Sequence, residues 1–155
     1  MPSRAWRCWA GCVTMAAELT DAEAVVLTVS AESDMILVRQ VLRTVAQRVG
    51  LGLVDQTKII TAGSELARNI LTYATGSRGT VRIEEVRNRG RRGVKATFSD
   101  DGPGIPDIDQ ALTDGFSTNR SLGLGLPGAK RLCDEMTITS AAGSGTTVTV
   151  VKWAR

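Results

Sequence analysis

The sequence predicts an α+β two-layer sandwich, with a mixed, mostly antiparallel sheet covered on one face by helices. Three observations predict it. Two helix-periodic segments follow one another directly, β-rich runs come in pairs joined by short polar turns, and the length suits one domain. The chain has 155 residues, 43% of them hydrophobic, which is enough for a single core. Helices bunched between antiparallel strand pairs pack on one face of the sheet that those strands form.

The first elements expected along the chain are a strand and two helices. A β-branched run over 25–30 predicts the strand. Ser33 and Asp34 are caps for a helix that continues to about Val49, where Gly50 and Gly52 end it. The second helix begins at Asp55 and ends near Gly76. The apolar residues expected to face the core are Leu37, Val41, Val45 and Val49 in the first helix and Ile59, Ile60, Leu66, Ile70 and Tyr73 in the second.

A β-hairpin and a helix with two further strands complete the predicted domain. Residues 80–88 and 93–100 are β-rich runs joined by the polar turn RGRR. We interpret this basic turn as a solvated loop, with a docking patch for an acidic partner as the alternative. A helix over about 125–134 precedes two strand-like runs, MTITSA and TTVTVVKW, which the glycine turn AGSG separates. The basic residues around the hairpin turn are Arg87, Arg89, Arg91, Arg92 and Lys95.

The composition excludes several classes of protein. The formal charge is +3, but basic and acidic residues are mixed and only 4% of residues are aromatic, which disfavours a dedicated nucleic acid binder. No run of eighteen apolar residues occurs, so no membrane span is predicted. Three cysteines without zinc-ligand spacing, and no histidine, exclude a mixed Cys/His metal site and favour a reducing, cytoplasmic location. The cysteines are Cys8, Cys12 and Cys133.

The first residues of the chain are expected to lie outside the folded domain. Residues 1–19 are interpreted as a disordered leader or a misassigned start upstream of Met15, and residues 20–155 as the domain itself. The apolar run near the start is too short and too interrupted for a convincing signal peptide. A weak secretion signal is the alternative interpretation.

Six of the sixteen glycines lie between residues 102 and 128, where the backbone must turn sharply or approach a ligand. The P-loop string GxxxxGK[ST] is absent, and a eukaryotic-type kinase would need a histidine. GxGxxG matches at Gly123, Gly125 and Gly128, but a polar loop precedes it where a dinucleotide site requires a strand. A different nucleotide site is therefore indicated.

Asp100, Gly102 and Gly104 form DxGxG directly after a β-rich run. An ionised aspartate only accepts hydrogen bonds, which suits the exocyclic amine of adenine and disfavours the carbonyl that guanine carries at that place. The pattern predicts a selector for ATP over GTP. A tight turn without a ligand is the alternative interpretation.

Glu65 and Asn69 lie four residues apart on the second helix, so their side chains project from one face. An amide oxygen together with phosphate oxygens suits magnesium, and a nearby carboxylate could orient or deprotonate an attacking hydroxyl. An ordinary exposed polar pair is the alternative.

The segment from Leu122 to Leu132 is the expected phosphate site, because glycines let backbone amides approach oxygen atoms and a helix begins there. Lys130 and Arg131 lie in the first turns of that helix and could reach the phosphates, a partner or solvent. The stretch 111–122 is predicted to be a lid over the nucleotide, with its small polar residues Gly115, Ser117, Thr118 and Asn119.

The strings ELARN, DDGPG, GLGLGLPG and GSGTT occur in the order of the four boxes of the GHKL superfamily, which includes gyrase, a heat-shock chaperone, histidine kinases and the MutL repair proteins. The chain resembles its small bacterial anti-sigma and switch serine kinases over residues 20–153. DQTKIITAGSELARNILTYA and DDGPGIPDIDQALTDGFST are most similar to the RsbT branch. The resemblance implies a Bergerat-type ATP-binding fold.

The resemblance also implies roles for individual residues. Glu65 corresponds to the catalytic base, Asn69 to the magnesium ligand and Asp100 to the adenine anchor. Thr146 corresponds to the residue that supports that aspartate, and Arg131 to an arginine near the phosphates and the partner surface. The remaining nucleotide-binding positions are Gly102 and Gly104 in one loop and Gly123, Leu124, Gly125 and Leu126 in the phosphate loop.

The family implies an ATP- and Mg²⁺-dependent serine/threonine kinase that phosphorylates STAS-domain proteins of a stressosome-like complex and then activates a PP2C-type phosphatase. The alternative is an anti-sigma factor kinase that sequesters a sigma factor. The lid ends in NRSLGLGLP, without the FGL-type continuation of the anti-sigma kinases, which favours the switch kinase. A histidine kinase ATPase domain and a non-enzymatic ATP-sensing adaptor are the other hypotheses.

Overall fold

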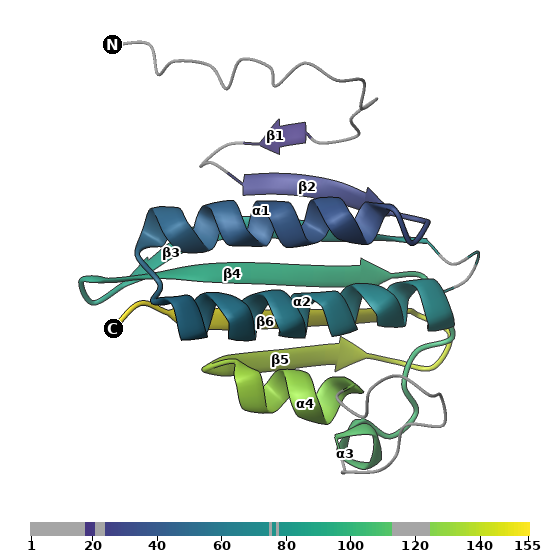
Figure 1. Ribbon diagram of the computed structural model, residues 1–155. Coiled ribbons are helices and arrows are strands. Elements are labelled where there is room, and N and C mark those ends of the chain that lie inside the picture. Colours follow the sequence, from purple (N-terminus) through teal and green to yellow (C-terminus); the bar gives the residue numbers. More distant parts are fainter. Residues whose placement is uncertain (1–17, 21–23, 75, 77, 113–124) are drawn as a thin grey trace.

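An antiparallel sheet forms one layer of the molecule (Figure 1). The computed structural model describes residues 18–20, 24–74, 76, 78–112 and 125–155. The six strands lie in the order β1-β2-β3-β4-β6-β5, and every pair of neighbours is antiparallel. The predicted α+β fold is confirmed, with an antiparallel sheet throughout the described part. The strands are β1 (Glu18–Thr20), β2 (Ala24–Val29), β3 (Gly79–Asn88), β4 (Arg91–Asp100), β5 (Glu135–Ser140) and β6 (Thr146–Trp153).

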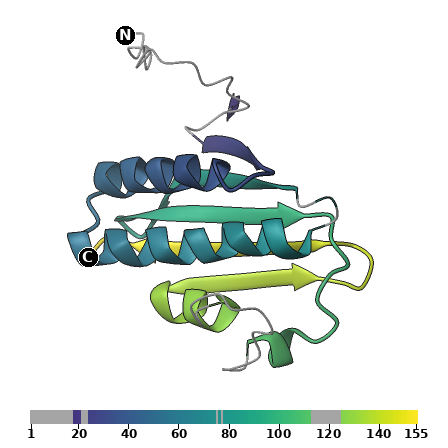
Figure 2. The same ribbon diagram turned by 45° about the vertical axis from the view of Figure 1, so that its right-hand side comes forward.

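Two long helices cover one face of this sheet (Figures 1 and 2). They run antiparallel to each other, and α2 also packs against the shorter α4. The helices are α1 (Asp34–Val49), α2 (Leu53–Tyr73), α3 (Ile108–Ala111) and α4 (Gly125–Leu132). No helix in the described ranges is both long and apolar enough to cross a membrane.

The core lies between the helices and the sheet. Alternate residues of β4, namely Val94, Ala96 and Phe98, are buried under the helices, whereas Lys95 and Thr97 between them are half-buried on the other face. Full burial of such an apolar side chain contributes about 1.5–3 kcal/mol. The largest fully buried side chains from the helices are Met35, Val38, Leu42, Ile59, Leu66 and Ile70.

The helical predictions differ from the structure at two residues, Ser33 and Tyr73. Ser33 makes no side-chain cap; instead the Asp34 carboxylate accepts hydrogen bonds from the backbone N–H groups of Ser30 and Ala31, at 2.9 and 3.0 Å. Tyr73, expected to face the core, is 49% exposed, and it is the last residue of α2. Gly50 ends α1 as predicted, in the left-handed conformation with φ of 86°.

The β3–β4 hairpin is tighter than predicted. Its turn consists of Arg89 and Gly90 alone, both with positive φ values of 49° and 80°, and Asn88 pairs with Arg91. This two-residue geometry matches the right-handed twist of the strands. Arg91 and Arg92, expected in a solvated loop, therefore belong to β4.

A buried lysine joins three elements at the same end of the sheet as this hairpin. Lys152 of β6 is 3% exposed, and its Nζ lies 3.0 Å from an oxygen of Asp134 and 3.3 Å from one of Asp55 in the first turn of α2. A buried cation without such partners would be strongly destabilising. The network holds the start of α2 and the α4–β5 junction against β6.

The remaining terminal predictions are only partly covered by the structure. Residues 1–17, including Cys8 and Cys12, lie outside the described residues, and β1 begins at Glu18, before the predicted domain start.

Burial raises the pKa of the Cys133 thiol to about 12, so this cysteine stays protonated at neutral pH and is no nucleophile.

Candidate functional site

The nucleotide-loop motif lies where β4 ends and β6 begins, at the end of the sheet remote from the β3–β4 hairpin, on the right in Figure 1. Asp100 is the last residue of β4 and pairs with Thr146, the first residue of β6. The carboxyl end of α2 reaches the same place: a Cβ added to Gly102 would lie 2.8 Å from the carbonyl oxygen of Tyr73. Residues distant in the sequence thus meet around the loop that follows Asp100.

The Asp100 carboxylate is held by its own loop. Its Oδ1 accepts a hydrogen bond of 2.8 Å from the backbone N–H of Gly102. Its second oxygen has no hydrogen-bond partner among the described residues, and the side chain is only half-buried. One oxygen therefore orients the group, and the other remains able to accept a hydrogen bond from a ligand.

Two glycines around Asp100 leave no room for a side chain. Gly145 has φ of 77°, and a Cβ there would collide with the backbone carbonyl of Asp100. Gly104 has φ of 79°, and its Cβ would collide with the carbonyl of Ala141. Both positions require glycine on grounds of conformation and space. The loop after β4 and the β5–β6 turn are therefore in close backbone contact at these two glycines.

Ser140, which the sequence analysis missed, ties these two segments. Its hydroxyl accepts a 2.7 Å hydrogen bond from the N–H of Ile105 and donates to the carbonyl of Gly145 at 3.1 Å. The Ser140 hydroxyl also lies 2.9 Å from the Thr146 hydroxyl. Because Ser140 already donates its one proton to Gly145, the Thr146 hydroxyl is the donor in this hydrogen bond. The Thr146 side chain thus reaches the Asp100 loop through Ser140. No sequence pattern singled out Ser140, because one serine at the end of a strand is not specific to any role.

Ser140→Ala is expected to raise the dissociation constant for ATP roughly three- to tenfold, because it leaves the Ile105 N–H without an acceptor at a cost of ~1 kcal/mol or more. The melting temperature should fall with it. Calorimetric titration with ATP measures the effect. Ser144→Ala, in the exposed part of the same turn, is the matched control. Equal ATP affinity in both variants would refute the role.

Glu65 and Asn69 occupy one face of α2, but they are not the exposed pair that the alternative interpretation supposed. Glu65 is only 6% exposed, and Asn69 is half-buried. The Glu65 carboxylate has no hydrogen-bond partner or ion pair among the described residues. A buried carboxylate without a partner is costly to retain, which favours a functional role.

The phosphate segment is described only in part. Gly125 and Leu126 form the start of α4, with Gly125 at φ of 45° and Leu126 packed against the core. Lys130 and Arg131 are exposed on the same helix. Gly123, Leu124 and most of the predicted lid, including Gly115, Ser117, Thr118 and Asn119, lie outside the described residues.

The residues present fit a magnesium ion that is bound mainly through a nucleotide. Within the described ranges, no three His, Cys, Asp or Glu side chains gather to hold a metal. Mg²⁺ keeps several waters and commonly takes one protein ligand together with phosphate oxygens. The half-buried Asn69, one turn before the end of α2 that borders the nucleotide loop, can be that single ligand.

Comparison with known proteins identifies this arrangement. Residues 54–154 match the family of histidine kinase-, DNA gyrase B- and HSP90-like ATPases. The chain belongs to this family. Its matched segment contains Glu65, Asn69, Asp100 and Thr146, and it begins with α2 and ends with β6.

A relative narrows the assignment within the family. The chain is 52% identical over 124 residues to the serine/threonine-protein kinase RsbT of Bacillus subtilis strain 168, which covers 80% of this chain and 92% of that protein. The chain is accordingly an RsbT-like, ATP-dependent serine/threonine kinase of the GHKL superfamily.

A solved structure has the same fold. The RsbU and RsbW domains of Rv1364c from Mycobacterium tuberculosis align with a TM-score of 0.56 and 25% identity over 84% of this chain. This GHKL kinase spans 33% of the length of that larger chain.

Proposed function

We propose that this kinase transfers the γ-phosphoryl group of ATP to a serine or threonine of STAS-domain proteins in a stressosome-like complex, and then activates a PP2C-type phosphatase. The observation that carries the proposal is the 52% identity to RsbT over 80% of the chain. Residues 20–155 would form the kinase domain. A cytoplasmic location is proposed because the reaction consumes ATP.

Adenine would be recognised at the end of β4. The oxygen of Asp100 that has no described partner would accept a hydrogen bond from the exocyclic amine, while the Gly102 N–H holds the other oxygen at 2.8 Å. Gly102 and Gly104 keep this loop narrow, and Thr146 supports it through Ser140. A carboxylate presents no donor to guanine, so ATP is favoured over GTP.

The phosphates would lie toward the start of α4. Gly123, Leu124, Gly125 and Leu126 would supply backbone amides, and the amino end of a helix favours negative charge. Arg131 would stabilise the phosphates or the partner surface. Asn69 would hold the magnesium ion, which neutralises phosphate charge when bound.

Glu65 would act on the acceptor hydroxyl. The carboxylate of this largely buried residue, with no described partner for its oxygens, can orient a serine hydroxyl and take its proton as the new P–O bond forms and the bond to ADP breaks. The proton passes to Glu65, and ADP leaves with the electron pair of the broken bond.

Phosphorylation would release the substrate. A phosphoryl group adds close to two negative charges, and in a desolvated contact these are repelled or must be solvated again. The kinase freed in this way could bind the phosphatase.

Asn69→Ala is expected to weaken Mg²⁺-dependent ATP binding about tenfold or more, because the ion would lose its one protein ligand. Binding in the presence of EDTA should change little. Calorimetric titration with and without Mg²⁺ measures the difference, and Asn88→Ala at the opposite end of the sheet is the control. Unchanged affinity with Mg²⁺ would contradict the metal assignment.

The decisive experiment offers Mg²⁺ and radiolabelled ATP to the kinase with candidate STAS proteins and a sigma factor in separate reactions. Label on a STAS protein supports the proposed function. Stable binding of the sigma factor would instead favour the anti-sigma kinase, and nucleotide binding without any transfer would favour an ATP-sensing adaptor.

A further inference from the structure

The outer side of the helix layer carries a group of three arginines. α1 and α2 lie side by side over the sheet (Figures 1 and 2). Arg39 of α1 joins them, because its Nε donates a hydrogen bond of 2.9 Å to the Ser64 hydroxyl of α2. Arg43 follows Arg39 by one turn, and Arg68 follows Ser64 by one turn. The three arginines therefore lie together along the line where the two helices meet.

These arginines point away from the sheet. Leu42 and Ala67, which directly precede Arg43 and Arg68 in the sequence, are fully buried beneath the helices. Arg43 is exposed, and Arg39 and Arg68 are half-buried. Adjacent residues of a helix project in different directions, so the buried residues face the core and the arginines face outward on one surface.

No ion pair balances the three charges within the described residues. Asp34, at the start of α1, accepts hydrogen bonds from the backbone before that helix. Asp55, at the far end of α2, is bound to Lys152. Glu65 is buried, and the exposed Glu32 before α1 pairs with no described cation. The arginine surface thus has an excess of positive charge.

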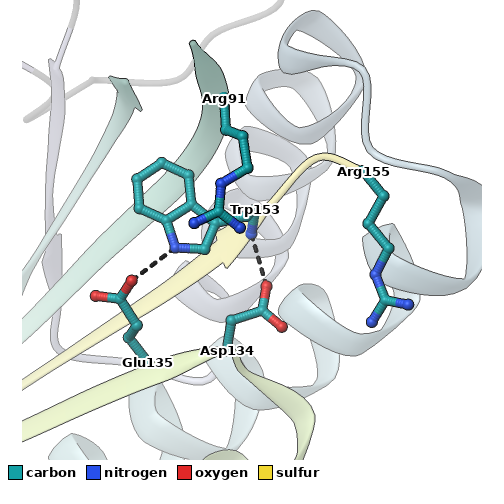
Figure 3. Close-up of a pocket in the computed structure, with 5 residues that line it drawn as sticks. All are labelled: Arg91, Asp134, Glu135, Trp153 and Arg155. Atoms are coloured by element: carbon teal, nitrogen blue, oxygen red, sulfur yellow. Dashed lines mark hydrogen bonds between the residues drawn. The ribbon is translucent and has the colours of Figure 1, made fainter. Parts of the chain in front are cut away.

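Arginines at the opposite end of the sheet have partners of their own. Arg87 and Arg92 share the Glu85 carboxylate, at N–O distances of 3.1 and 2.9 Å. Arg91 stacks on Trp153, with its guanidinium carbon 5.2 Å from the ring centroid (Figure 3). The pocket around that ring contains as many carboxylates as arginines. The outer face of α1 and α2 differs because its arginines have no carboxylate beside them that the structure describes as a partner.

An exposed apolar side chain lies next to these arginines. Ile36 is 57% exposed, and it precedes Arg39 by three residues, so the two are neighbours on the surface of α1. Arginine is enriched at protein interfaces, where apolar contacts form the centre and charged groups surround it. The composition of this surface is therefore that of a protein interface.

The same surface adjoins the catalytic residues. Arg68 follows Glu65 by three residues and precedes Asn69 directly, so its side chain neighbours that of Glu65 on α2. A protein held at Arg68 would lie next to the residue proposed as the base.

We propose that the surface formed by Ile36, Arg39, Arg43 and Arg68 docks an acidic segment of a protein partner. Carboxylates of the partner would pair with the guanidinium groups, whose planar N–H donors fit a carboxylate bidentately, and an apolar side chain would contact Ile36. A nucleic acid fits less well, because the basic group is short and ends at an apolar residue. The proposal depends on the surfaces of α1 and α2, and not on which protein is phosphorylated.

The test titrates the full-length chain, in the presence of Mg²⁺ and ADP, into a fluorescein-labelled glutamate peptide with interspersed leucines, and follows the fluorescence anisotropy. Arg43→Gln and Arg68→Gln should each raise the Kd about three- to fivefold, and the double variant about tenfold or more, because each change removes one ion pair. Arg89→Gln, which removes the same charge at the β3–β4 turn, should change the Kd less than twofold. Higher salt should weaken binding.

A second peptide of the same length, made of glutamate alone, tests the apolar contact. The wild-type chain should bind the leucine-containing peptide more tightly, and Ile36→Ser should remove most of that difference. Equal affinity of the wild-type chain for both peptides would refute the contact with Ile36.

An unchanged Kd in the Arg43→Gln, Arg68→Gln double variant, or an equal loss in Arg89→Gln, would overturn the docking surface. Tighter binding of a DNA duplex of the same charge than of the peptide would overturn the assignment to a protein partner. These titrations need no phosphate transfer. If the chain labels no STAS protein yet binds the peptide through Arg43 and Arg68, the docking surface stands while the proposed function fails.

Discussion

Glu65→Gln is expected to lower the rate of phosphate transfer to the protein substrate at least about a hundredfold, while ATP binding changes less than twofold. Glutamine keeps the size and the buried position of the side chain but cannot accept a proton at neutral pH. General base catalysis contributes roughly 10²–10⁴-fold to rates. Single-turnover transfer of radiolabelled phosphate measures the loss.

The buried position of Glu65 requires a control for folding. The thermal unfolding midpoint of Glu65→Gln should stay at or above that of the wild type, because the variant removes a buried charge that has no described partner. Glu32→Gln, at an exposed position before α1, should leave both transfer and stability unchanged. Full transfer activity in Glu65→Gln would eliminate this residue as the base.

Asp100→Asn is expected to lower ATP affinity about 10- to 100-fold and to narrow the preference for ATP over GTP. If the amide oxygen of the new side chain keeps the hydrogen bond from the Gly102 N–H, its NH₂ group faces the adenine amine, and two donors oppose each other. Loss of a hydrogen bond to a charged group costs about 1.5–3 kcal/mol. Competition titrations with ATP and GTP measure both effects.

The neighbouring aspartate supplies a matched control for this prediction. Asp101 is exposed and makes no described side-chain hydrogen bond, so Asp101→Asn removes the same charge one residue away. It should alter ATP affinity by less than about twofold, since exposed charges are screened. An equal loss in the two variants would mean that overall charge, and not adenine recognition, determines the affinity.

Much of the fold followed from local patterns. Capping residues, the spacing of apolar side chains and turn chemistry all act over a few residues. These local features predicted the end of α1 at Gly50, the long α2, the hairpin and the last two strands. The hairpin turn was predicted too long because Arg91 and Arg92, which are polar, had been assigned to the loop. Their pairing with β3 became evident only from the register.

The site was predicted only as a set of motifs. Asp100, Gly102, Gly104 and Thr146 could be named from their strings, but Ser140 could not, because a single serine at the end of a strand carries no specific pattern. Its importance arises from the alignment of β5 with β6 and from the approach of Ile105 to it. The burial of Glu65 was likewise not predictable, since an i, i+4 pair on a helix does not reveal what packs over it.

The sequence alone determined the family boxes and, except for β1, the order of the strands and of α1, α2 and α4, because these depend on the chemistry of neighbouring residues. Tertiary structure decided which oxygen of Asp100 remains available, how Lys152 is neutralised and that Arg91 stacks on Trp153. Such contacts join residues that are far apart in the chain. They exist only once strand register and helix packing have brought those residues within a few ångströms of one another.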